Sequence, residues 1–194
     1  MDPVNIIFAV VFFLSFASNF NKSKKGLKKK NTLIENKSKS ILQTLPLNVA
    51  AIVVLLQILG IFDIGRISNN WDLQILRLAF ILVYVASSYY ILIAQKTLGD
   101  NYHSELVIYR DDKLVTNGIY KFIRHPIYLF QLVADFAAGI VLLNFIILPV
   151  VIFIELPLFY MRAKEEEAML SQHFKAGYND YVKKSGFFSP KLRS

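Results

Sequence analysis

The sequence contains no cysteine, so disulfide bonds, cysteine-ligated metal sites and thiol nucleophiles are excluded. Histidine is also scarce, and His103, His125 and His173 do not stand at the short spacings that zinc sites use. No G-x-G-x-x-G motif follows a strand-like segment, which argues against a Rossmann nucleotide-binding loop. We therefore expect no metal ion and no Rossmann domain.

Acidic residues are few: 14 stand against 22 lysines and arginines, which gives a formal net charge of +8 over 194 residues. Hydrophobic residues nevertheless make up 55% of the chain, and the mean hydropathy is +0.43. A soluble domain of this length is seldom both so apolar and so basic, because its core would be too small for its apolar side chains. The composition predicts one integral membrane domain, formed by residues 1–194.

Five apolar stretches have the composition of membrane helices, at about residues 4–20, 46–64, 73–97, 127–143 and 145–161. The last two form one apolar run, which as a single helix would be about 52 Å long against a hydrocarbon core of about 30 Å. This run must therefore fold back, and we predict the turn at Asn144. The expected fold is all-α and polytopic, with five transmembrane helices and a C-terminal helical hairpin.

Basic residues predict the orientation of these helices. Eight lysines lie between residues 22 and 39, in a loop better suited to anionic lipid headgroups than to nucleic acid. If this loop is cytoplasmic, 20 of the 22 basic residues fall on the cytoplasmic side, and only Arg66 and Arg77 do not. The positive-inside rule then predicts an outside N-terminus, with residues 98–126 and 162–194 in the cytoplasm.

The stretch NGIYKFIRHPIYLF, residues 117–130, joins a polar segment directly to a membrane helix. Proline suits the first helical position and keeps the preceding residue out of the helical region, so Pro126 should begin the helix and His125 should cap it. A helix N-terminus favours an anionic ligand group. We therefore expect a binding site at the edge of the bilayer, close to Tyr120, Arg124 and Tyr128.

Two motifs carry a resemblance to a known family. LVTNGIYKFIRHPIY, residues 114–128, resembles the L-V-T-x-G-x-Y-x-x-x-R-H-P-x-Y signature of the isoprenylcysteine carboxyl methyltransferases and the related phospholipid methyltransferases. RAKEEEAML, residues 162–170, resembles the R-x-x-x-E-E-x-x-L segment of the same family. One departure is Lys175, which follows Phe174 where the family usually has glycine. The resemblance covers residues 98–188.

The resemblance implies a membrane enzyme that binds S-adenosylmethionine and methylates the carboxylate of an S-isoprenylated cysteine, on a protein C-terminus or a small molecule. The lipid chain would enter from the bilayer, and the cofactor from the cytoplasm. Arg162 would bind the substrate and act in catalysis. The implied cofactor residues are Lys113, Leu114, Val115, Tyr120, His125, Pro126, Ile127, Tyr128 and Glu166.

The chemistry of methyl transfer fits these residue types. A carboxylate acceptor is already ionised at neutral pH, so the reaction needs positioning rather than a general base. Arg162 can hold a carboxylate by a forked hydrogen bond, and Glu166 can pair with the ammonium group of the cofactor. Asp135 and Glu155 lie inside predicted spans, where with Gln131 they would either line a substrate channel or satisfy one another.

Three alternatives remain open from the sequence. The related branch of the family methylates phospholipid amines, for which the acceptor nitrogen must first lose a proton. Some sterol-type reductases, which use NADPH, end in a similar Arg-His-Pro-x-Tyr segment. A membrane module without catalytic activity would use the same residues only to cap helices and contact headgroups.

Overall fold

The computed structural model describes residues 2–26, 33–67 and 73–191, with the side chains of residues 20–26 left out of the description. The protein is mostly helical, and a two-stranded antiparallel sheet is the only sheet within these ranges. The α-helices are α1 (Pro3–Gly26), α2 (Leu45–Ile61), α3 (Gln74–Leu98), α4 (Pro126–Val141), α5 (Ile147–Val150), α6 (Leu156–Phe174) and α7 (Ala176–Lys184). The strands are β1 (Ile34–Lys37) and β2 (Val107–Tyr109), and a π-helix, Val151–Glu155, joins α5 to α6.

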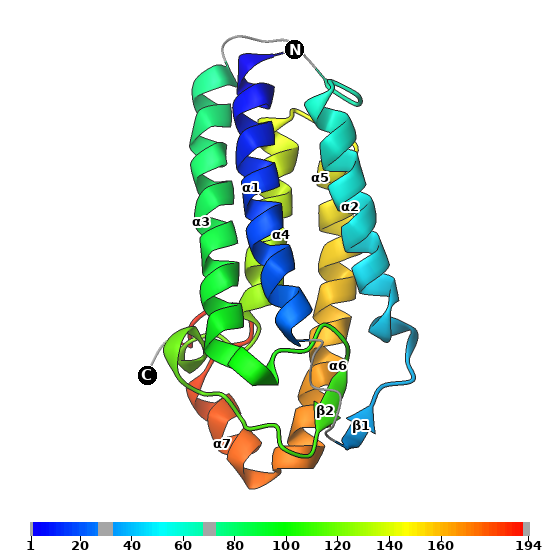
Figure 1. Ribbon diagram of the computed structural model, residues 1–194, viewed down its shortest axis with the longest axis vertical. Helices are drawn as coiled ribbons and strands as arrows, with labels where there is room; N and C mark the ends of the chain where they lie inside the picture. Colours follow the sequence, from blue (N-terminus) through cyan, green and yellow to red (C-terminus); the bar gives the residue numbers. More distant parts are fainter. Residues whose placement is uncertain (1, 27–32, 68–72, 192–194) are drawn as a thin grey trace.

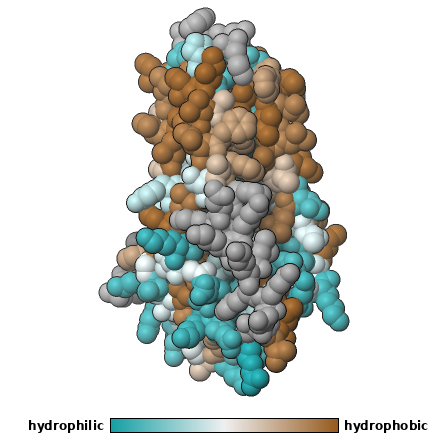
Figure 2. All heavy atoms as spheres, viewed as in Figure 1, coloured by the Kyte–Doolittle hydropathy of each residue, from teal (hydrophilic) through white to brown (hydrophobic). Residues whose placement is uncertain are grey.

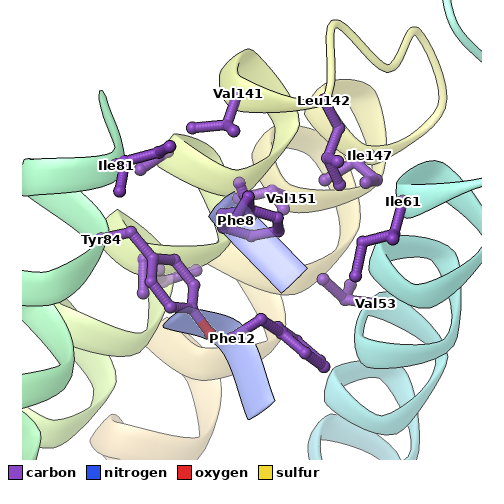
Figure 3. Packing of buried hydrophobic residues seen from close by; sticks show 14 of the residues in the cluster. Phe8, Phe12, Val53, Ile61, Ile81, Tyr84, Val141, Leu142, Ile147 and Val151 are labelled. Carbon is purple, nitrogen blue, oxygen red and sulfur yellow. The ribbon is translucent and has the colours of Figure 1, made fainter. Parts of the chain in front are cut away.

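The long helices run side by side and form a bundle, whereas α7 and both strands lie together at one end (Figure 1). The N-terminus of α1 lies at the opposite end. Apolar side chains from α1 to α5 meet in the bundle interior, where Phe8 and Phe12 of α1 pack near Tyr84 of α3 and Val53 of α2 (Figure 3). The ring centroids of Phe8 and Tyr84 are 5.1 Å apart in an edge-to-face arrangement.

Large apolar side chains also cover the outside of the bundle, for example Leu14, Leu82 and Phe153. Figure 2 shows that the apolar surface forms a band over the long helices, while hydrophilic residues gather at the end that carries the strands and α7. Within the described residues, the segments Ile41–Ile61 and Gln74–Asn101 are long and apolar enough to cross a membrane, and Pro3–Asn19 and Pro126–Val141 are shorter apolar helices. An exposed apolar band of this kind suits lipid rather than water.

The helices lie close to the five stretches predicted from the sequence, with differences at their ends. Residues 62–64 and 142–143, predicted as helical, belong to turns, and the last apolar stretch becomes helical only at Ile147. The predicted helical hairpin is present. The prediction of a loop over the lysine-rich residues 22–39 is wrong in part: residues 22–26 belong to α1 and residues 34–37 form β1, while residues 27–32 lie outside the described residues.

Asn144 forms the hairpin turn, as predicted, and its buried side chain explains the position. Its Oδ1 accepts hydrogen bonds from the amides of Ile146 (2.9 Å) and Ile147 (3.1 Å), so it caps α5. Its Nδ2 donates to the carbonyl of Ile64 at 2.9 Å, which ties the hairpin to the end of α2. The asparagine thus satisfies backbone groups that an apolar residue would leave unpaired.

A polar network closes the bundle at the N-terminal end. The buried guanidinium of Arg77 donates to Asp2 Oδ2 (2.9 Å), to Asn5 Oδ1 (2.6 Å) and to the carbonyl of Val141 (2.6 Å). Burial alone would raise the pKa of Asp2, but hydrogen bonds from Arg77 and Arg66 outweigh it and hold that pKa below its usual range. The network joins α1, α3 and α4. Its hydrogen bonds offset the cost of burying the charged side chain of Arg77 in apolar surroundings.

The departure at Lys175 generates a test of backbone strain. Lys175 joins α6 to α7 with φ 49° and ψ −122°, a conformation that favours glycine. We expect Lys175→Gly to stabilise the protein by about 0.5–1 kcal/mol and to raise Tm by about 2–4 °C, because relief of strain outweighs the greater freedom of the unfolded chain. Thermal unfolding in detergent measures the change. Ala176→Gly, in the first turn of α7, is the matched control and should lower Tm.

Candidate active site

One cavity of about 440 Å³ lies between the bundle and the C-terminal helices. All ten residues that the family resemblance singled out line this cavity, although they come from three separate segments of the chain. They are Lys113, Leu114, Val115, Tyr120, His125, Pro126, Ile127, Tyr128, Arg162 and Glu166. The volume is within the range of small-molecule sites.

The segment before α4 is held in place by the C-terminal tail. The amide of Gly186 donates to the carbonyl of Phe122, and the amide of Arg124 donates back to the carbonyl of Gly186, each at 2.9 Å. Tyr181 Oη also donates to the carbonyl of Tyr120 at 2.7 Å. Pro126 begins α4 and His125 occupies its N-cap position, as predicted, but the His125 side chain makes no capping hydrogen bond.

Arg162 is 2% exposed and connects four parts of the protein. Its Nε donates to Tyr128 Oη (3.0 Å), its Nη1 to the carbonyls of Leu42 (2.7 Å) and Gln43 (2.8 Å), and its Nη2 to the carbonyl of Ser104 (2.7 Å). Four of its five N–H groups are therefore in use. All four acceptors are uncharged, and no carboxylate forms an ion pair with Arg162 within the described residues.

Glu166 lies one helical turn after Arg162, on the same side of α6. Its Oε2 accepts a hydrogen bond from Tyr128 Oη at 3.0 Å, and it lies 3.8 Å from His125 Nδ1. Tyr128 therefore joins the positive charge of Arg162 to the negative charge of Glu166. The carboxylate of Glu166 stays more than one-third exposed, so it remains accessible to a ligand in the cavity.

Glu167 was not singled out in the sequence, although it is the second glutamate of the R-x-x-x-E-E motif. Its Oε1 accepts a hydrogen bond from Arg124 Nε at 2.7 Å and lies 3.4 Å from His125 Nε2. Burial would raise the pKa of Glu167, but the hydrogen bonds from His125 and Arg124 lower it to about 2. Glu167 thus clamps α6 to the segment that precedes α4.

The segment that follows α3 brings to the cavity wall further polar groups that neither sequence motif includes. His103 Nε2 lies 3.0 Å from Asp112 Oδ2, and Asn101 Oδ1 accepts a hydrogen bond from the Lys113 amide at 2.8 Å. Ser104, the next residue, supplies a carbonyl to Arg162. The segment therefore links the predicted cofactor residues near Lys113 to the predicted substrate residue.

Two tyrosines in the cavity wall keep their protons at neutral pH. Burial and the nearby Glu166 raise the pKa of Tyr120 well above its usual value. Burial and Glu167 do the same for Tyr178, whose hydroxyl is buried without a hydrogen-bond partner among the described residues. A buried hydroxyl without a partner is costly, so a polar ligand group beside Tyr178 would be favourable.

Comparisons with known proteins agree with these features. The model of the isoprenylcysteine carboxyl methyltransferase (ICMT) family matches residues 78–172. The protein-S-isoprenylcysteine O-methyltransferase of Dictyostelium discoideum is 37% identical over 93 residues, which are 47% of this chain and 39% of that relative. A solved structure of the eukaryotic intramembrane Ras methyltransferase ICMT matches with a TM-score of 0.69 at 21% identity, over 98% of this chain and 68% of that chain.

The family match runs from Leu78 in α3 to Gln172 in α6 and so includes both sequence motifs. The predicted resemblance to the isoprenylcysteine carboxyl methyltransferases is therefore confirmed. The structural likeness extends to the N-terminal helices, which have no recognisable motif, and shows an ICMT-like membrane fold for the chain. The chain spans well under half the length of the relative from Dictyostelium discoideum.

The Glu167 clamp predicts how stability depends on pH. Because the folded pKa of about 2 lies below the unfolded value of about 4.3, the clamp stabilises the protein above about pH 4. This contribution disappears as the pH falls towards 2. We expect Glu167→Gln to lower Tm at pH 7 by about 3–6 °C, and to make Tm less dependent on pH between about 4 and 2.

Glu166→Gln is the matched control for this prediction, because it removes a neighbouring carboxylate that lies outside the clamp to Arg124. It should lower Tm by less than Glu167→Gln does. An equal loss in both variants, with parallel pH profiles, would show that the clamp has no special role in stability.

Proposed function

We propose that this chain, whose central part carries the isoprenylcysteine carboxyl methyltransferase signature, transfers a methyl group from S-adenosylmethionine to the carboxylate of an S-isoprenylated cysteine. The observation that carries the proposal is the arrangement Arg162–Tyr128–Glu166 in the cavity wall, with Tyr128 Oη at 3.0 Å from both partners. The cavity thus offers a positive charge for an anionic acceptor and a negative charge for a cationic donor.

The residues present fit S-adenosylmethionine on the chemistry of their groups. Glu166 would hold its ammonium group, and the free amides at the start of α4 would receive its carboxylate. The aromatic faces of Tyr120 and Tyr128 would lie against adenine or the sulfonium. Lys113, Leu114, Val115, His125, Pro126 and Ile127 would complete the pocket wall. When bound, the cofactor supplies an electrophilic methyl group.

Arg162 would orient the acceptor carboxylate. Its neutral hydrogen-bond partners leave its charge available, but only one N–H, on Nη2, is left for a substrate unless a carbonyl is released. Arg162 would therefore make a single charge-assisted hydrogen bond to the acceptor carboxylate instead of the expected forked one. An ionised carboxylate needs no general base, so orientation and exclusion of water are the tasks of the protein here.

The apolar band supports the five-span topology as part of this proposal. The strands, α7 and the cavity mouth would face the cytoplasm, where most basic residues lie, and the N-terminus would face the opposite side. The isoprenyl chain would then enter sideways from the bilayer, and the cofactor would enter from the water. Membrane lipids are the expected surroundings.

Methylation of N-acetyl-S-farnesyl-L-cysteine by the purified protein tests the proposal. Arg162→Lys keeps the charge but loses the planar hydrogen-bonding group, so kcat/KM should fall by about 100-fold or more. S-adenosylhomocysteine should bind Glu166→Gln at least about tenfold more weakly than the original protein, and its binding to Arg162→Lys should fall by less than this. Lys183→Met, an exposed change on α7, is the control.

The pH dependence of the rate separates carboxylate from amine acceptors. A carboxylate stays ionised, so kcat/KM should be flat from about pH 6 to 8 with the prenylcysteine acceptor. With a phospholipid amine, the rate should rise with pH, because the nitrogen must lose a proton before it attacks. Activity that appears only with the amine and rises with pH would replace the carboxyl methyltransferase proposal by the N-methyltransferase one.

A further inference from the structure

The cavity does not end at Arg162 but continues into the bundle between α2, α3 and α4. Tyr128, Gln131 and Asp135 succeed one another along one face of α4 and all line it. Asp135 lies seven residues beyond Tyr128, or about 10 Å along the helix axis. The inner end therefore lies about two helical turns deeper in the apolar band than the predicted methyl-transfer site.

Polar side chains gather at this inner end, where a lipid tail alone would favour apolar ones. Gln57 Nε2 of α2 donates to Asp135 Oδ1 at 2.6 Å, and Gln131 Nε2 donates to Asp135 Oδ2 at 2.7 Å. Both amide groups thus point their donors at the same carboxyl group. Both glutamines use their amide nitrogens for these hydrogen bonds, and among the described residues no donor reaches their side-chain carbonyl oxygens.

Glu155 lies beside Asp135 but does not line the cavity. It is 0% exposed and faces Asp135 from the last position of the π-helix. Its carboxyl group shares a side-chain hydrogen bond with that of Asp135, so it adds no free acceptor to the cavity. π-helices are rare, and those that occur are often found at functional sites. Buried polar groups need hydrogen-bond partners. Gln57, Gln131 and Asp135 together form what we call the acceptor cluster, whose unused acceptors are the carbonyl oxygens of the two glutamines.

The remaining wall of the inner chamber is largely apolar, with Phe12, Val54 and Ala134 among its residues. A plain hydrocarbon chain would fill this space but would leave the acceptor cluster without donors. A lipid chain that carries a hydrogen-bond donor at the depth of Asp135 would fill the apolar space and would also donate to the acceptor cluster. In a site built to hydrogen-bond a ligand group, the analogue that lacks the group is disfavoured.

We infer that the acceptor cluster recognises a hydroxyl group on the lipid chain of the acceptor, about two helical turns from the carboxylate that Arg162 orients. The inference rests on the proposed function and narrows its substrate class to a hydroxylated isoprenyl chain or one of similar shape. The acceptor carboxylate lies near Arg162, the apolar part of its chain lies against Phe12 and Val54, and its hydroxyl donates to Gln57 or Gln131.

Equilibrium binding of two matched ligands tests the inference. The ligands are N-acetyl-S-geranyl-L-cysteine and its ω-hydroxylated analogue, each measured in detergent with S-adenosylhomocysteine present. We expect the hydroxylated ligand to bind the original protein about tenfold more tightly. In at least one of the variants Gln57→Leu and Gln131→Leu, this ratio should fall to about one, because the hydroxyl then meets an apolar side chain in place of its acceptor.

Ile52→Ala is the matched control, since Ile52 is exposed on α2 and lies outside the cavity; it should keep the ratio. Thermal unfolding identifies a variant that fails to fold, and the other glutamine variant then decides. The inference is overturned if the original protein binds the plain ligand as tightly as the hydroxylated one, if neither binds, or if both folded variants keep the ratio.

Methyl transfer to the same two ligands distinguishes a failure of this inference from a failure of the proposed function. The expected binding ratio without any methyl transfer would contradict the proposed function and leave the lipid site in place. Methyl transfer to both ligands at equal kcat/KM, with equal dissociation constants, would overturn the inference alone.

Discussion

The four hydrogen bonds of Arg162 are the interaction on which the site depends. They join α6 to Tyr128 of α4, to the carbonyls of Leu42 and Gln43 before α2, and to the carbonyl of Ser104 after α3. Each partner is far from Arg162 in the sequence, so one side chain fixes the relative position of four segments. A buried guanidinium is costly unless its donors are satisfied, and here neutral groups satisfy most of them without cancelling its charge.

In these apolar surroundings, the other buried polar groups of the bundle also need hydrogen-bond partners. Arg77 is satisfied by Asp2, Asn5 and a carbonyl at the N-terminal end, and Asn144 satisfies the backbone at the hairpin turn. Both groups therefore stabilise helix ends or helix contacts and leave no polar atom for a ligand. The cavity differs, because Glu166 and Tyr178 retain polar atoms that no described residue satisfies fully. Unsatisfied groups are thus concentrated where a ligand can reach them or their neighbours.

The sequence predicted the parts of the structure that depend on local chemistry. Pro126 marks the start of α4, Asn144 marks the turn, and the two motifs identified residues that line one cavity although α4 and α6 lie far apart in the chain. The features that the sequence did not predict depend on contacts between residues that lie far apart in the chain. The role of Glu167 follows from Arg124, and the crowded guanidinium of Arg162 follows from backbone carbonyls, which carry no side-chain signature.

The two ends of the cavity both contain carboxyl groups, but these have different hydrogen-bond partners. Near Arg162, Tyr128 joins the guanidinium to the carboxylate of Glu166, which is more than one-third exposed, so these opposite charges can orient ionic groups. Near Asp135, the same carboxylate chemistry lies deeper in the apolar band, and the amides of Gln57 and Gln131 take the place of cations. Amides satisfy a carboxyl group without adding charge, but each also brings a carbonyl acceptor. An excess of acceptors at the inner end is therefore the direct result of avoiding a second buried cation.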